Sequence, residues 1–81
     1  MNLERAAMKG KLADLKDKRR AAELRAEGLC RSIRSELNTL IRPVAECEVP
    51  TAAQQMDDLV AAWGELASLD GQIARLTREL D

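Results

Sequence analysis

The chain has 81 residues, so it can form one small domain at most. Of these residues 33% are charged, yet the net charge is only −1. It contains no Phe, no Tyr and a single Trp, which disfavours β-sandwiches and barrels, because strands draw on aromatic and β-branched residues. Its abundant Ala, Leu, Glu, Lys and Arg are typical of long helices and predict an all-α fold.

A first helix is predicted over residues 2–41, with Asn2 as its N-cap. Its apolar or small residues recur in steps of four and three, which is a heptad repeat: Met8, Leu12, Leu15, Ala22, Ala26, Leu29 and Ile33. Two charged residues, Arg19 and Glu36, also fall at core positions of this repeat. No proline interrupts residues 2–41, so a single helix is expected.

A connector is predicted over residues 42–51, because Pro43 and Pro50 each disfavour helical geometry in the residue before them. Thr51 and Gln54 have the spacing of a capping box. This local signal predicts a second helix over residues 52–80, with Thr51 as its cap.

The second helix also shows a heptad repeat, and its expected core positions are Ala52, Met56, Leu59, Trp63, Leu66, Asp70, Ile73, Thr77 and Leu80. Val60, Leu69 and Leu76 widen this apolar stripe beyond what one neighbouring helix can cover. Gly64 and Gly71 occupy equivalent positions seven residues apart. They are interpreted as surface glycines, the alternative being the close approach of another helix.

Charge predicts that the two helices pair with each other. Residues 1–42 hold eleven Lys or Arg against six acids, whereas residues 43–81 hold two against eight. An antiparallel hairpin lays the basic helix against the acidic one. Folding about the predicted connector places residues whose numbers sum to about 93 opposite one another, which brings Arg19 within about a turn of Asp70. The longer first helix is then expected to overhang at residues 1–11.

The prediction is therefore a single domain, residues 1–81, folded as a two-helix antiparallel hairpin with coiled-coil character. Because both apolar stripes are wide, the hairpin is expected to dimerise into a four-helix bundle or to dock on another helical protein. The residues expected to form the interaction surface lie on the second helix: Met56, Leu59, Val60, Trp63, Leu66, Leu69, Ile73 and Leu76. The function expected from this pattern is that of a non-catalytic protein–protein interaction module.

The alternative function is that of a nucleic-acid accessory protein. A basic cluster on the first helix would contact phosphates, and its residues are Lys9, Lys11, Lys16, Lys18 and Arg20. Against this, the cluster lacks aromatic side chains for base stacking, and the connector replaces the tight turn of a helix-turn-helix.

Enzymatic activity, a metal site, a cofactor and a small-molecule substrate are not expected. The chain has no His, and its two cysteines, Cys30 and Cys47, have no imidazole partner and are too few for a zinc site. Both are expected to be free thiols in a reducing cytoplasm. No apolar run approaches the length of a membrane span, and no membrane association is expected.

Three stretches of the chain carry a resemblance to a known group: Asn-Leu-Glu-Arg-Ala at the start, residues 27–34, and residues 73–80. They resemble small helical hypothetical proteins of Mu-like prophages. The resemblance implies a bacterial cytoplasmic setting and a phage-related role, and it carries no established activity and no functional residue.

Overall fold

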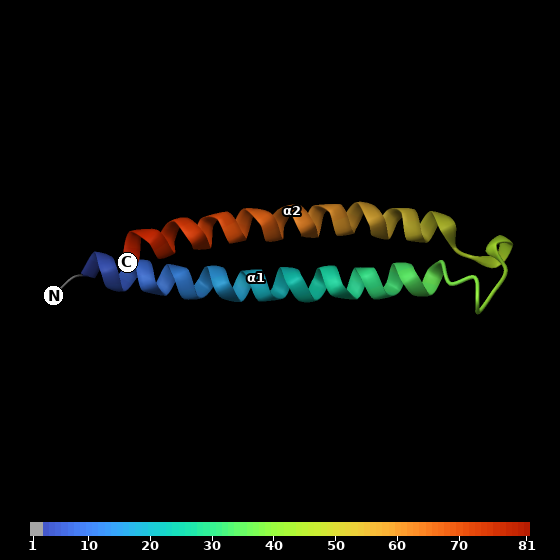
Figure 1. Cartoon of the computed structure of the whole chain (residues 1–81), viewed down its shortest axis with the longest axis horizontal. Coiled ribbons are helices and arrows are strands. Elements are labelled where there is room, and N and C mark those ends of the chain that lie inside the picture. The colour runs from blue at the N-terminus through green and yellow to red at the C-terminus, as the bar shows by residue number, and fades with distance from the viewer. Residues whose placement is uncertain (1–2) are drawn as a thin grey trace.

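The computed structural model describes residues 3–81, in which two long helices lie side by side (Figure 1). Helix α1 spans Leu3–Glu36, the 3-10 turn η1 spans Val44–Glu46, and helix α2 spans Val49–Leu80. The helices run antiparallel along a rod of 65 × 15 × 15 Å, and the start of α1 and the end of α2 lie at the same end of it. The predicted all-α hairpin is confirmed. The predicted N-cap Asn2 lies outside the described residues.

Helix α1 ends at Glu36, five residues before the predicted end at residue 41. The backbone tightens there, since Leu37 N–H still bonds the Ile33 carbonyl while Asn38 N–H bonds the Ser35 carbonyl. The Asn38 side chain then accepts the Leu40 N–H at 3.0 Å. Asparagine side chains compete with helical hydrogen bonds in this way. The sequence pattern predicted that Pro43 ends the helix, but the helix ends well before this proline.

Helix α2 begins at Val49, three residues before the predicted start at residue 52, and its N-cap is Glu48. The capping box was the wrong signal, because Thr51 lies inside the first turn and caps nothing. Pro50 is in that first turn as well. Its ring fixes φ near the helical value, and the first turn does not use the N–H that proline lacks. The proline interpreted as part of the connector therefore starts the helix.

These two boundaries shift the register of the hairpin. Ser32 contacts Gln55, and Arg5 contacts Leu80, so residues whose numbers sum to about 87 lie level, against the predicted 93. The reason is the connector, which occupies residues 37–48 and has its midpoint about four residues earlier than predicted. Helices of 34 and 32 residues also match in length. The overhang predicted at residues 1–11 is wrong, because α2 reaches α1 as far as Arg5.

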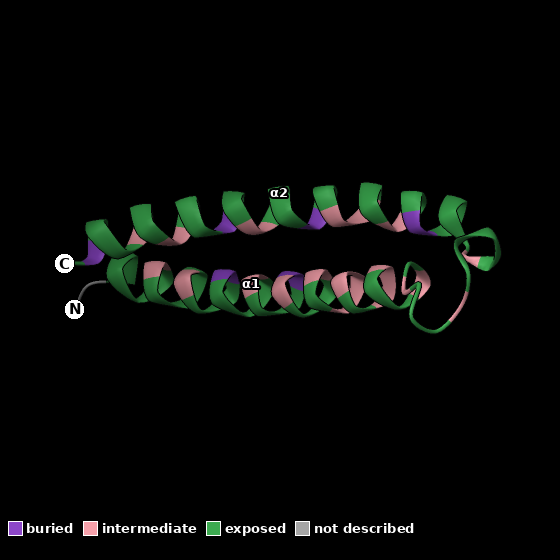
Figure 2. Cartoon of the chain, turned by 45° about the vertical axis from the view of Figure 1, so that its right-hand side comes forward, coloured by how far each residue is buried: buried purple, intermediate pink, exposed green. Residues whose placement is uncertain are grey.

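The core lies between the helices, as the inward-facing purple and pink segments of Figure 2 show. On α1 the buried and half-buried residues follow the predicted heptad repeat, including Leu15 and Ala22. On α2 four of the nine predicted core positions are wrong, because Met56, Trp63, Asp70 and Thr77 are exposed. The residues that replace them inside the hairpin are Gln55, Ala62, Leu69 and Leu76.

This rotation of α2 follows from the polar residues on its stripe. Turning Met56 and Trp63 inward would also turn Asp70 inward, and a carboxylate is far more costly to bury than an apolar side chain is to expose. The observed orientation instead buries Leu69, which packs in one cluster with Leu15 and Ala22. The cluster is thin, as expected for two helices that each bury a single stripe. Among residues 3–81, neither helix has a stretch apolar enough to cross a membrane.

Candidate interaction surface

One polar contact crosses the middle of the hairpin. The Arg19 guanidinium donates hydrogen bonds to Asp70 on α2 and to Glu23 on its own helix, so the predicted contact between Arg19 and Asp70 is confirmed. The hydrogen bond to Asp70, and then that to Glu23, raise the pKa of Arg19 above its ordinary value. Exposed ion pairs contribute little to stability. The pair occupies a core position of α1, where an isolated polar residue discriminates between registers.

The charge difference between the helices produces few other direct contacts in residues 3–81. A further ion pair joins Arg42 of the connector to Glu36 of α1 at 4.0 Å and does not cross between the helices. Gln55 Nε2 donates to Ser32 Oγ at 2.7 Å, and Arg5 Nη2 donates to the Leu80 carbonyl at 2.6 Å. Polar contacts at both ends and in the middle thus hold the register.

The structure divides the residues predicted as the interaction surface into two groups. Four of them serve the hairpin itself: Leu69 is buried in the core cluster, and three others pack against it, Leu66, Ile73 and Leu76. The remaining four face outward or lie half-buried at the edge of the core: Met56, Leu59, Val60 and Trp63. We call these four residues the apolar flank.

The side chains of the apolar flank are largely exposed to solvent, although they are large and apolar. The exposed fraction is 52% for Met56, 59% for Val60 and 67% for Trp63. Half-buried Cys30 of α1 lines the same hollow as all four flank residues. Monomeric soluble proteins rarely leave large apolar side chains gathered and uncovered on one surface. The flank is the part of the predicted surface that the hairpin leaves uncovered.

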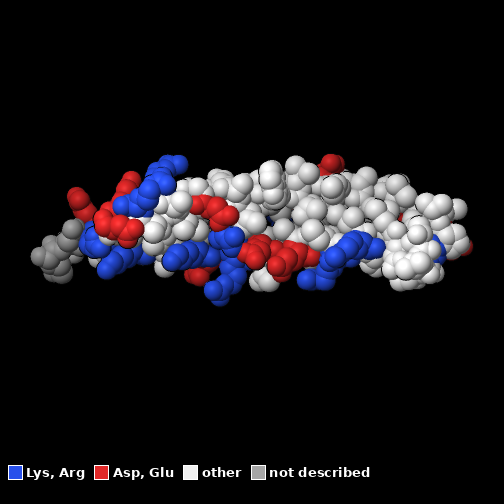
Figure 3. Space-filling view, in the orientation of Figure 1, with Lys and Arg blue, Asp and Glu red and all other residues white. Residues whose placement is uncertain are grey.

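A groove between the helices continues from the apolar flank, and its α1 side was missed by the sequence prediction. Leu59, Leu66 and Trp63 line it from α2. From α1 it is lined by Arg19, Glu23, Ala26, Glu27, Cys30, Arg31 and Arg34. Figure 3 shows a red group beside a blue group along α1, below a white stretch of α2. The signal that could have found this rim is the heptad repeat of α1, whose outward positions next to the core hold Glu23, Glu27 and Arg34.

A second group of exposed apolar residues lies at the tip of the hairpin. Its members belong to the connector and the first residue of α2: Leu37, Leu40, Ile41, Val44 and Val49. Leu40 is 96% exposed. The tip and the apolar flank both lie in the connector-proximal half of the rod, which separates them from the strongly charged half near the chain ends (Figure 3).

The five basic residues of the alternative function are all exposed: Lys9, Lys11, Lys16, Lys18 and Arg20. They do not form one stripe. Lys11 borders a pocket together with Gln72 and Arg75, whereas Lys16 and Arg20 lie in a hollow with Glu23 and Glu27 on the other side of the core. Because the predicted overhang is absent, the cluster lies beside α2. Nucleic-acid binding by these residues stays a prediction.

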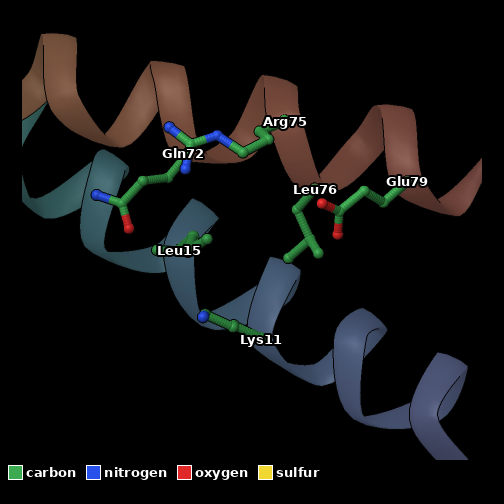
Figure 4. Close-up of a pocket in the computed structure, with 6 residues that line it drawn as sticks. All are labelled: Lys11, Leu15, Gln72, Arg75, Leu76 and Glu79. Carbon is green, nitrogen blue, oxygen red and sulfur yellow. The ribbon is translucent and has the colours of Figure 1, made fainter.

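The pocket near the chain ends is shallow and lined largely by exposed polar side chains (Figure 4). Leu15 and Leu76 lie between the two helices, and around them lie Lys11, Gln72, Arg75 and Glu79. The two cysteines are free, as predicted. Within residues 3–81, no three His, Cys, Asp or Glu side chains gather to hold a metal ion.

The two outward glycines do not meet another part of the chain. A Cβ atom built on Gly64 or Gly71 has no neighbour within 4 Å. Within this hairpin they are therefore surface glycines, as the sequence interpretation held.

Comparison with protein families, with curated proteins and with solved structures gives no match to this chain.

Proposed function

We propose that this protein is a non-catalytic helical interaction module, which acts through the apolar flank by homodimerisation or by docking on a partner protein. The observation that carries the proposal is the exposure of Met56, Val60 and Trp63 on one side of α2. A hairpin that buries one stripe of each helix leaves such a surface uncovered, and a further helix is the simplest element to cover it.

The exposed tip supports the same proposal. Leu40 and Ile41 lie at the end of the rod with no cover from either helix, which extends the apolar surface around the connector-proximal half. The phage-related and cytoplasmic setting is part of the proposal and rests on the resemblance of residues 27–34 and 73–80 to proteins of Mu-like prophages.

Replacing both Val60 and Trp63 by glutamate is expected to abolish binding while leaving the hairpin folded. Both side chains are exposed, and glutamate is a better helix former than valine or tryptophan. Binding is measured by sedimentation of the purified chain and by co-purification of the tagged chain with bacterial proteins, and folding by circular dichroism.

The matched control replaces two exposed residues of the opposite side of α2, Ala61 and Ser68, by glutamate. The proposal requires this control to bind like the wild type. It is contradicted when the flank variant, still helical, retains every self-association and every co-purified protein of the wild type.

A further inference from the structure

The groove and the apolar flank have a common centre. Because Ser32 contacts Gln55, the next helical turn of α1, at Gly28, lies level with Leu59 and Val60. Leu59 and Val60 are also the middle of the apolar flank, with Met56 on one side and Trp63 on the other. A symmetric partner that covers the flank therefore has its centre level with Gly28 of α1.

The α1 rim of the groove reverses its charge at that level. Arg19, Glu23 and Glu27 lie on one side of Gly28, where Arg19 pairs with Glu23, and Arg31 and Arg34 lie on the other. Glu27, Arg31 and Arg34 make no ion pair among residues 3–81. These charges are thus acidic at Glu27 and basic at Arg31 and Arg34, and their complement is a rim that runs in the opposite direction.

A second copy of the chain supplies that complement. Two identical faces can stack about a two-fold axis that lies in the plane of contact. When this axis runs across the groove, at right angles to the helices, α1 lies antiparallel on α1 and α2 antiparallel on α2. Glu27 of each copy then faces the basic residues Arg31 and Arg34 of the other, and each apolar flank covers the apolar flank of the other copy.

The other in-plane arrangement is disfavoured by the same residues. An axis parallel to the helices would place α1 on α2 of the second copy, so that Glu27 would lie over apolar residues such as Leu59. Burying carboxylates against an apolar surface without a partner is costly.

We propose that a second copy of this chain occupies the groove and the apolar flank in this antiparallel arrangement, with Glu27 of each copy facing Arg31 of the other. Trp63, Val60 and Met56 form the apolar centre of the contact. The proposal rests on the proposed function and specifies its partner. Stable interfaces bury about 800 Å² per partner, which is roughly an eighth of the 6048 Å² surface of the chain.

The first test is the dimer dissociation constant of the full chain, measured by sedimentation equilibrium for the wild type, Val60→Glu and Ala61→Glu. Val60→Glu places two carboxylates at the symmetric centre and is expected to weaken the dimer by about a hundredfold or more. Ala61→Glu, on the exposed opposite side, leaves it unchanged. An equal effect of the two substitutions overturns the proposal.

The second test exchanges charges across the axis. Glu27→Arg and Arg31→Glu each place like charges together at two symmetric positions, and each is expected to weaken the dimer about tenfold. The double variant restores the opposite charges between copies and is expected to recover the wild-type constant. Singles that do not weaken the dimer, or a double variant as weak as the singles, overturn the arrangement.

A matched charge pair with the same spacing on α1 serves as control. Asp14→Lys and Lys18→Asp reverse exposed charges outside the groove and leave the dimer constant unchanged. Circular dichroism separates loss of helix from loss of contact in every variant.

The two proposals fail in different ways. If the chain stays monomeric at high concentration but binds another protein through Val60 and Trp63, the proposal of a second copy is wrong and the proposed interaction module stands. If the chain dimerises and Val60→Glu does not change the dimer dissociation constant, the chain self-associates through another surface and the proposed contact is wrong.

Discussion

Replacing Leu69 by alanine is expected to lower the free energy of unfolding by about 2–3 kcal/mol. Leu69 is 6% exposed and shares the core cluster with Leu15 and Ala22. Removing its branched end leaves a cavity that two stiff helices cannot close without moving apart. A domain of this size has only about 3–5 kcal/mol to lose, so the variant is expected to melt well below the wild type when followed by circular dichroism.

The control for this prediction is the same substitution at Leu24, which is 60% exposed on α1. Leu24→Ala removes an equal volume of side chain and keeps a good helix former, so its effect on stability is expected to stay within about 0.5 kcal/mol. Both variants are compared with the wild type at one protein concentration, because self-association raises apparent stability. Equal losses at the two positions would contradict the observed orientation of α1 and α2.

The largest single effect is expected for Ala62→Glu. Ala62 has an exposed fraction of 0%, and the register set by the contact between Ser32 and Gln55 places it about level with Ala26 of α1. Glutamate needs room that is absent there and would carry a charge into the contact without a partner. The free energy of unfolding is expected to fall by more than about 3 kcal/mol, which leaves the chain largely unfolded by circular dichroism.

Ala61→Glu is the matched control, since it makes the same chemical change at the neighbouring, exposed position of α2. Its stability is expected to equal that of the wild type within about 0.5 kcal/mol. A folded, stable Ala62→Glu variant would show that the buried side of α2 is not the one that contains Leu69 and Leu76.

The sequence predicted the all-α hairpin because hydrophobic periodicity and opposite charge both act over whole helices. It did not predict the helix ends, since local competition decides them: the Asn38 side chain ends α1, and Pro50 starts α2 within the segment that the capping pattern assigned to the connector. The register error of about one and a half turns follows from these two ends. The contact between Arg19 and Asp70 was still predicted, because the sequence analysis placed these residues only within about one helical turn of each other and the register error is not much larger than that.

For a related reason, the sequence did not show which of the residues predicted as the interaction surface stay exposed in the hairpin. An apolar stripe wider than one contact does not say which of its edges faces the other helix. The burial cost of Asp70 decides this, and that cost depends on the whole row of residues beside Trp63. The charged rim of the groove was missed because Glu27 and Arg31 resemble an ordinary i, i+4 pair on a solvated helix. Their complementarity appears only when α1 is placed beside the flank of α2.

The central claim is that one side of α2 packs against α1 and the other, the apolar flank, binds another molecule. The fluorescence of Trp63 tests this claim most directly. Trp63 is the sole tryptophan of the chain and is two-thirds exposed in the single hairpin. As the concentration of the wild type rises from the submicromolar to the submillimolar range, its emission is expected to shift to the blue and acrylamide quenching to fall, and Val60→Glu is expected to abolish both changes. An emission already that of a buried tryptophan at the lowest concentration, and identical in Val60→Glu, would contradict the account.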